Sequence, residues 1–310
     1  MDTAPAIHTE GLTKRFGSLE ALVNLDLDVG PGEVFGYLGP NGAGKTTTIR
    51  LLLGLAHPSA GRSQIFGLDS QADAVEAHRR LAYCPGEATL WPSLTGEETL
   101  HLLGQVQSRT QARVDPVYRT ELIERFNLDP SKKVRAYSKG NRQKVVLIAA
   151  LMGRADLLIL DEPTSGLDPL MEQVFRACIA EAKRNGQTVF LSSHILSEVE
   201  ALCDRVAILR AGRLAEVGTL AEMRHLSAVL VEAAFDGPPP DVRFVPGVAL
   251  VQVDGTRLRC QVRGSMEPLL KALAAAGVRE LLSREPSLEE LFLAHYGPGP
   301  ARVEAEPQPL

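Results

Sequence analysis

The chain reads Gly39-Pro40-Asn41-Gly42-Ala43-Gly44-Lys45-Thr46 at the point that decides its fold. This stretch matches the pattern G-x-x-x-x-G-K-[ST], which wraps backbone N–H groups around the phosphates of a bound nucleotide. It lies between an apolar segment, Glu33 to Leu38, and an apolar segment with helical character, Ile49 to Leu53. The motif requires a buried strand, a glycine-rich loop and a helix in this order, so the sequence predicts a nucleotide site here.

The residues of this loop have separate expected roles. Lys45 is expected to reach the outer phosphates, and the hydroxyl group of Thr46 is expected to bind Mg²⁺. Thr47 and the loop residues from Gly39 to Gly44 complete this part of the expected nucleotide-binding set. A glycine-rich turn that only caps a helix is the alternative, and the lysine and threonine in register disfavour it.

Two acidic residues follow a second apolar run. The segment Leu157 to Leu160 predicts a buried strand, and Asp161 and Glu162 come directly after it. Carboxylates at the carboxyl end of a strand in an open α/β sheet face the crevice in which ligands bind. We therefore expect Asp161 to hold hydrated Mg²⁺ and Glu162 to act as the general base for the attacking water. The alternative is that Asp161 and Glu162 are two solvated acidic residues at the start of a loop.

Strand and helix signals alternate through most of the chain. The segment Leu25 to Val29 alternates apolar and acidic residues before a Gly-Pro-Gly turn, which predicts a half-buried antiparallel strand. Helical periodicity dominates residues 86–155. Strand signals return after them, at 157–160, 189–191 and 206–209. This alternation favours a largely parallel sheet, so we expect an α/β fold with a helical insert.

With these motifs in place, residues 6–220 resemble the ATP-binding subunits of ABC transporters. The resemblance implies a P-loop NTPase (RecA-like) core with an antiparallel β subdomain and a helical subdomain at about 86–155. It also implies that the chain is an ATPase whose cofactors are ATP and Mg²⁺. The other motifs of the family can then be sought one by one.

The signature sequence of the family, LSGGQ, has a variant form in this chain. Its place is taken by Ser138-Lys139-Gly140-Asn141, at the start of a predicted helix. By resemblance, these four residues bind ATP held by an opposite subunit. Lys139 and Asn141 depart from the consensus in a way that resembles drug-export members whose permease is a separate chain. A serine before a helix is also a common N-cap, and this alternative stays open.

Three single positions match further motifs. Asp168 ends Ser165-Gly166-Leu167-Asp168, which resembles the D-loop along the dimer seam, with an ordinary turn as the alternative. His194 resembles the switch histidine that contacts the γ-phosphate, although a lone histidine at a strand end is often a packing residue. Phe16 stands where the family has an aromatic ring that stacks on adenine, with a core aromatic residue as the alternative.

The chain departs from the family in the loop that leads into the helical insert. Gly86 occupies the position of a glutamine and offers no side chain to a metal ion or water. Glu87 follows it and could bring a carboxylate to the metal, so the expected metal ligands are Thr46, Asp161 and Glu87. A solvated loop acid is an equally compatible interpretation of Glu87.

Composition limits the classes of function. The chain is 45% hydrophobic and carries 33 Lys plus Arg against 38 Asp plus Glu, a net charge of -5, so neither disorder nor a global attraction for nucleic acid is expected. The local basic run from Lys132 to Lys144 has few aromatic residues, which favours a solvated face or phosphate steering over RNA binding.

The 4 scattered cysteines favour a reducing compartment. No apolar run reaches the roughly 20 residues of a membrane span.

The character of the chain changes after Gly218. Short strand signals, a helix at 267–276 and a closing helix at 288–295 predict a small α+β unit. We therefore expect a nucleotide-binding domain at 1–220, a C-terminal accessory α+β domain at 226–296 and a disordered tail at 297–310. The accessory domain resembles a region found on some drug-export ATPases.

These motifs lead to one main hypothesis about function. Two copies of the chain are expected to sandwich two ATP molecules and to drive a separate transmembrane permease from the cytoplasmic face of the membrane. Export, of drug- or antibiotic-like compounds, follows from the subclass resemblance only. The expected partners are a second nucleotide-binding subunit, as a homodimer, and the permease, with no nucleic acid. By resemblance, Trp91 lies where the family receives a helix of the membrane subunit, although it could equally cover its own subdomain core.

Two other classes remain as alternatives. A soluble ABC ATPase acting on ribosomes or nucleic acid usually has two nucleotide domains, or a long coiled coil between the positions of Lys45 and Ser138, and this chain shows neither. A regulatory nucleotide sensor that does not hydrolyse ATP is disfavoured by Glu162 and His194.

Overall fold

The computed structural model describes residues 4–108, 114–225 and 229–284. The chain divides into two compact units, Met1–Val217 and Gly218–Leu310, and each is described by itself. The helix expected at 288–295 and the tail expected at 297–310 lie outside the described residues.

The centre of the first unit is a six-stranded sheet with the order β10-β9-β3-β8-β7-β6. Its inner strands pair in parallel, as the alternation of strands and helices predicts. The strands are β3 (Val34–Leu38), β6 (Leu81–Cys84), β7 (Leu157–Asp161), β8 (Thr188–Ser193), β9 (Arg205–Arg210) and β10 (Arg213–Thr219). Every residue of β3, β7 and β8 is buried, which explains their nearly continuous apolar sequence.

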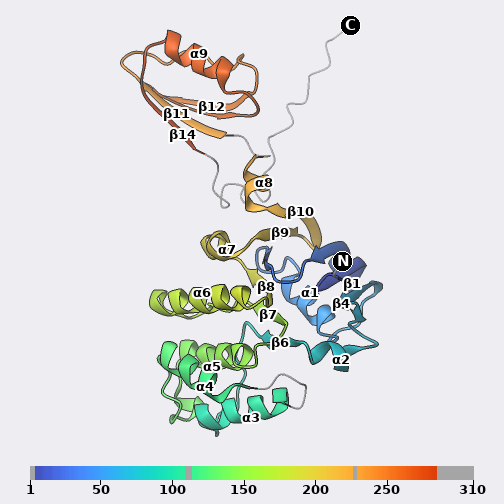
Figure 1. Cartoon of the computed structure of the whole chain (residues 1–310). Coiled ribbons are helices and arrows are strands. Elements are labelled where there is room, and N and C mark those ends of the chain that lie inside the picture. Colours follow the sequence, from blue (N-terminus) through green and yellow to red (C-terminus); the bar gives the residue numbers. More distant parts are fainter. Residues whose placement is uncertain (1–3, 109–113, 226–228, 285–310) are drawn as a thin grey trace. The chain divides into compact units, whose positions relative to one another are not determined.

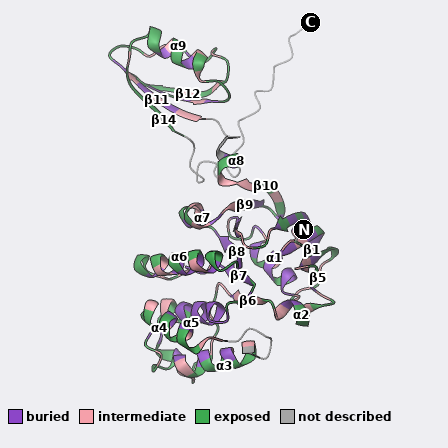
Figure 2. Ribbon diagram, viewed as in Figure 1, coloured by how far each residue is buried: buried purple, intermediate pink, exposed green. Residues whose placement is uncertain are grey.

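Helices cover both faces of this sheet. Figure 1 shows α1 (Lys45–Leu52) on one side, with α6 (Pro169–Arg184) and α7 (Leu196–Leu202) on the other. Helix α1 also packs against β2 and β4, whereas α6 packs on β8 and α7 on β3 and β8. The buried residues gather along the central strands (Figure 2). The nucleotide loop thus starts from the interior of a packed α/β core.

A separate four-stranded sheet with the order β2-β1-β4-β5 carries the N-terminal segment. Its strands are β1 (Ile7–Phe16), β2 (Leu19–Val29), β4 (Ala60–Ile65) and β5 (Leu68–Asp69), and the short helix α2 (Ala74–His78) follows. The β1–β2 and β1–β4 pairs are antiparallel. Leu25, Leu27 and Val29 are buried and the two aspartates between them are exposed, so the alternation in the sequence identifies this strand correctly.

The segment between β6 and β7 is helical. It contains α3 (Gly96–Ser108), α4 (Pro116–Arg125), the 3₁₀ turn η1 (Val134–Ala136) and α5 (Lys139–Leu151). Helices α3 and α4 both pack on α5, whose residues from Gln143 to Leu151 are all buried. Helix α5 therefore forms the core of this helical region and begins at the signature residues.

The second unit is a small α+β structure. Helix α8 (Leu220–His225) precedes a sheet with the order β12-β13-β11-β14, and α9 follows β13. The bounds are β11 (Val229–Phe235), β12 (Val248–Asp254), β13 (Arg257–Val262), α9 (Glu267–Ala275) and β14 (Val278–Arg284). Val231, Leu258 and Leu273 belong to a separate hydrophobic core. The second unit therefore buries apolar surface independently of the first. Within the described ranges, no helix has the length and apolar character needed to cross a bilayer.

Candidate nucleotide site

The glycine-rich loop between β3 and α1 depends on backbone conformations that only glycine adopts easily. Gly42 and Gly44 have φ angles of +82° and +111°. A Cβ atom at Gly44 would lie 2.6 Å from the carbonyl oxygen of Ala21, whereas one at Gly42 would meet nothing within 4 Å. The first glycine therefore faces open space, and the second lets the start of α1 approach the neighbouring sheet.

An open cleft of about 540 Å³ lies over this loop. Its lining combines loop residues, Lys45 and Thr47 with Phe16 and Glu162. The ring of Phe16 is 52% exposed, and the ammonium group of Lys14 lies 4.8 Å from its centroid. A flat aromatic ligand could stack on the exposed ring, which agrees with the position expected for an adenine platform. The cleft joins a phosphate-binding loop and an aromatic surface.

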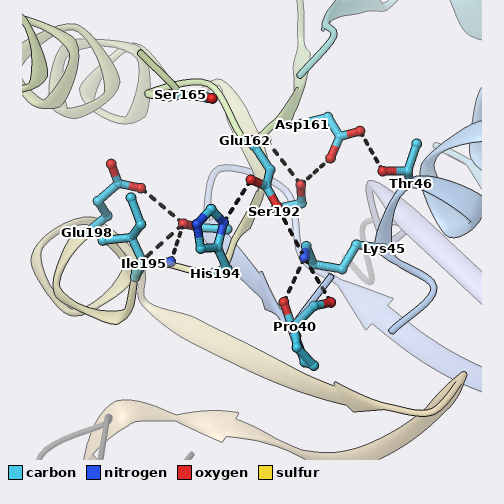
Figure 3. A network of polar contacts seen from close by, with 12 residues as sticks. Pro40, Lys45, Thr46, Asp161, Glu162, Ser165, Ser192, His194, Ile195 and Glu198 are labelled. Carbon is cyan, nitrogen blue, oxygen red and sulfur yellow. Dashed lines mark hydrogen bonds and ion pairs between the residues drawn. The ribbon is translucent and has the colours of Figure 1, made fainter. Parts of the chain in front are cut away.

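Lys45 is buried beside the loop and forms its contacts within the cleft. Its Nζ atom donates hydrogen bonds to the carbonyl oxygens of Gly39, at 2.6 Å, and Pro40, at 3.3 Å. The same atom lies 3.2 Å from Oε1 of Glu162 (Figure 3). The side chain is only 5% exposed, so this charge is held in a fixed place at the base of the cleft.

Asp161 is connected to two hydroxyl groups. Thr46 Oγ1 donates a hydrogen bond of 3.0 Å to Oδ2, and Ser192 Oγ donates to Oδ1. Carboxylate and hydroxyl oxygens are hard ligands, which Mg²⁺ prefers. Among the described residues, no three His, Cys, Asp or Glu side chains gather as a metal cage. One carboxylate and one hydroxyl group fit an ion that takes its remaining ligands from water and phosphate.

Glu162 occupies the junction between these groups. One carboxylate oxygen pairs with Lys45, and the other lies 2.8 Å from Nδ1 of His194 (Figure 3). Its backbone has a φ angle of +46°, an uncommon conformation for a glutamate. The backbone N–H donates to the carbonyl and hydroxyl oxygens of Ser192, which holds this conformation in place. The two residues expected to be catalytic, Glu162 and His194, are therefore in direct contact.

The residues that resemble the signature sequence, Ser138 to Asn141, lie at the start of α5. The Ser138 hydroxyl oxygen accepts a hydrogen bond of 3.2 Å from the backbone N–H of Asn141 and so caps α5, which is the simpler of the two interpretations. Ser138, Gly140 and Asn141 are not among the residues that line the clefts at the loop. Within one chain they are not brought to the nucleotide cleft, whereas Lys139 lines a second cleft beside it.

The signature helix contacts the segment that resembles the D-loop. The Nζ atom of Lys139 donates a 3.1 Å hydrogen bond to Ser165 Oγ. A Cβ atom at Gly140 would lie 2.4 Å from the carbonyl oxygen of Gly166. Asp168 caps α6 by accepting a 3.0 Å hydrogen bond from the backbone N–H of Met171. The two loops are therefore packed against each other.

Gly86 and Glu87 line the second cleft, of about 520 Å³, together with Thr46 and Asp161. A Cβ atom at Gly86 would lie 3.1 Å from the carbonyl oxygen of Asp161, so there is little room for a side chain in this conformation. Glu87 is exposed. The loop thus borders the acidic strand end, and Glu87 reaches the same cleft as the expected metal ligands.

Sequence reasoning missed Ser192 and Glu198. Ser192 lies opposite Asp161 in the parallel pairing of β7 and β8, and this register cannot be seen in the sequence. Glu198 lies in the first turn of α7, and its burial is known only from the folded chain. The pair Ser192-Ser193, at the end of the strand before His194, was the one available signal for Ser192.

Comparisons with known proteins agree with this geometry. A family model described as ABC transporter matches residues 22–165. The chain is 37% identical over 305 residues to the daunorubicin resistance ATP-binding protein DrrA3 of Streptomyces coeruleorubidus, covering 93% of this chain and 95% of that protein. It is 31% identical to the Nod factor export ATP-binding protein I of Rhizobium etli, covering 94% and 93%. A solved ATP-binding subunit of an ABC transporter superimposes with a TM-score of 0.65 at 32% identity, covering 71% of this chain and 92% of that one.

Proposed function

The chain belongs to the ATP-binding subunits of ABC transporters, and we propose that it powers a separate transmembrane permease that exports drug- or antibiotic-like compounds. The observation that carries the ATPase part is the contact of Glu162 with both Lys45 and His194, at the end of the strand that also carries Asp161. This arrangement supports the proposal that Glu162 is the base, Lys45 the cation that binds phosphate and His194 the switch residue.

We infer that ATP changes the partner of Lys45. The ammonium group pairs with Glu162 and donates to two carbonyl oxygens. The negatively charged outer phosphates of ATP compete for this ammonium group and bind at the backbone N–H groups of the loop. Glu162 is then free of its ion pair with Lys45, and its carboxylate can accept the proton of an attacking water.

Thr46 and Asp161 are the residues that we propose to hold Mg²⁺, with Glu87 as an additional carboxylate at the same cleft. When bound, the ion neutralises charge on the β- and γ-phosphates. Ser192 orients the Asp161 carboxylate by donating to its second oxygen. His194, 2.8 Å from Glu162, is placed to hold the base and then to contact the γ-phosphate.

We propose that the active form is a dimer. Ser138, Gly140 and Asp168 lie outside the two clefts at the loop, which supports a role for them at the site of a second copy. The helix that starts after Ser138 could direct its N-terminus at a phosphate there. ATP would then act as a bridge that closes the dimer, and hydrolysis would open it.

The proposals about the permease and the exported compounds are based on the relatives. The two curated relatives described above are named for daunorubicin resistance and Nod factor export. Their names support an export system, and we propose that this chain lies at the cytoplasmic face of the membrane, attached to the permease. No feature of the described chain favours a ribosome or nucleic acid as the partner.

Affinity purification of the tagged chain from membranes solubilised in mild detergent tests this proposal. We expect a multi-span membrane protein to co-purify in stoichiometric amount and to be identified by mass spectrometry. A tagged unrelated ATPase from the same membranes serves as the control. Recovery of the chain only from the soluble fraction, with ribosomes or DNA attached, would contradict the transporter proposal.

A further inference from the structure

Glu198 is a buried acidic residue that the steps described above do not use. It lies on α7, one turn after His194, and is 1% exposed. Burial raises the pKa of its carboxyl group, while Thr164, Ser193 and the charge of Arg176 lower it. A buried carboxyl group is costly unless it makes specific hydrogen bonds, so its contacts indicate what it does.

One contact reaches the loop that carries His194. The hydroxyl group of Ser193 donates a 3.0 Å hydrogen bond to Oε2 of Glu198 and accepts a 2.9 Å hydrogen bond from the backbone N–H of Ile195. Ser193 and Ile195 flank His194, so the hydroxyl group closes a tight turn around the histidine. Glu198 lies next to this turn, and His194 points from it toward Glu162 (Figure 3).

Groups on two other segments affect the pKa of this carboxyl group. The buried Thr164 side chain lowers it. Two charged residues on α6 also affect this pKa. The charge of Glu172 raises it, and the charge of Arg176 lowers it. The second carboxyl oxygen, Oε1, is buried and has no hydrogen-bond partner among the described residues. The hydrogen bond from Ser193 to Oε2 thus ties Glu198 to the histidine turn.

We propose that Glu198 is a positioning residue for ATP hydrolysis. Through the Ser193 hydroxyl group it fixes the turn that holds His194 against Glu162. The inference rests on the proposed function, because it assigns Glu198 to the same reaction.

The test compares steady-state ATP hydrolysis with equilibrium ATP binding in purified full-length variants. Misplacing a catalytic group costs up to about a hundredfold in rate, so we expect Glu198→Ala to lower kcat at least about tenfold. The ATP affinity should stay within about twofold of wild type, because no contact to nucleotide is lost. Glu198→Gln should keep most of the rate, since its carbonyl oxygen can still accept from Ser193.

A second variant distinguishes the loss of one hydrogen bond from a general folding defect. Ser193→Ala removes only the hydroxyl group, and we expect a loss of rate similar to that of Glu198→Ala. The double variant should be no slower than the slower single variant if both residues act through one contact. Ser197→Ala, at an exposed position of the same helix, is the matched control and should hydrolyse ATP at the wild-type rate.

The outcomes separate this inference from the proposed function. Absence of ATP hydrolysis by the wild-type chain would reject the proposed function itself. Wild-type turnover in both Glu198→Ala and Ser193→Ala, or losses that add independently in the double variant, would overturn only the role assigned to Glu198. A fall in ATP affinity that matches the fall in rate would also overturn it.

Discussion

Lys45 illustrates at the scale of one residue how the site is prepared for its ligand. Its charge is buried and neutralised by Glu162 and by two carbonyl oxygens of its own loop. A phosphate group would replace these partners with stronger charge-assisted hydrogen bonds. On binding ATP, Lys45 would therefore exchange these partners for phosphate.

Replacement of this residue should affect binding before chemistry. A hydrogen bond to a charged group contributes about 1.5–3 kcal/mol, so Lys45→Ala should weaken ATP binding by roughly ten- to a hundredfold. Isothermal titration with ATP and Mg²⁺ measures this change. Lys132→Ala, an exposed lysine paired with Asp129, is the control and should bind ATP normally. Unchanged affinity in Lys45→Ala would count against the placement of phosphate at this loop.

The sequence predicts some residues of this site better than others. The loop from Gly39 to Thr46 and the pair Asp161 and Glu162 are contiguous, so their spacing alone indicates where they lie. Ser192 joins the site only through the register between β7 and β8. The φ angle of Glu162 depends on the same serine, since Ser192 accepts both hydrogen bonds from the Glu162 backbone N–H. Tertiary pairing of this kind cannot be derived from a pattern along one strand.

At the scale of elements, periodicity identified the long helices and the regular strands. The strand β2 alternates buried and exposed residues over its second half, and this pattern is visible in the sequence. Its partner β1 contains shifts in register at several places, with Gly11 at a φ of +53°, and the alternation breaks down there. The sequence therefore gives no clear signal for β1, although this strand pairs with β2 in the sheet.

The contact between α5 and the segment after β7 leads to a prediction about stability. A Cβ atom at Gly140 would lie 2.4 Å from a backbone oxygen of Gly166, and neither backbone can move without disturbing a loop. Overpacking of this kind costs about 1–3 kcal/mol, so Gly140→Ala should lower the midpoint of urea unfolding. It should also slow ATP hydrolysis.

Gly104 is the matched control for that substitution. A Cβ atom at this position, inside α3, would meet only side-chain atoms of Met152 and Val114, at 3.4 Å and beyond. Alanine is favoured over glycine inside a helix by about 0.5–1 kcal/mol, so Gly104→Ala should be neutral or stabilising. Equal stability of the two variants would show that the contact between Gly140 and Gly166 is not tight.

At the scale of the whole molecule, the nucleotide cleft belongs entirely to the first unit. All residues that line it lie between Phe16 and Gly212, and the second unit has a separate core. The expected division into a nucleotide-binding domain at 1–220 and an accessory domain from 226 remains a proposal about independent folding. Nothing in the sequence pattern alone indicates what the second unit does for the first.

Deletion of residues 226–310 addresses this question. We expect the shortened chain to bind ATP with an affinity within about twofold of the full chain, because no lining residue is removed. Size-exclusion chromatography with ATP and a turnover assay then report on the second unit. Unchanged dimerisation and turnover would exclude a regulatory or dimer-stabilising role, and a loss of ATP binding by a folded fragment would contradict the division of the molecule.

The most direct test of the central claim is the rate of ATP hydrolysis by Glu162→Gln compared with the wild-type chain. The amide cannot accept the proton of water, so turnover should fall by at least about two orders of magnitude. ATP binding should persist, and the variant should accumulate as a closed dimer with ATP. Wild-type turnover in Glu162→Gln would contradict the assignment of Glu162 as the catalytic base.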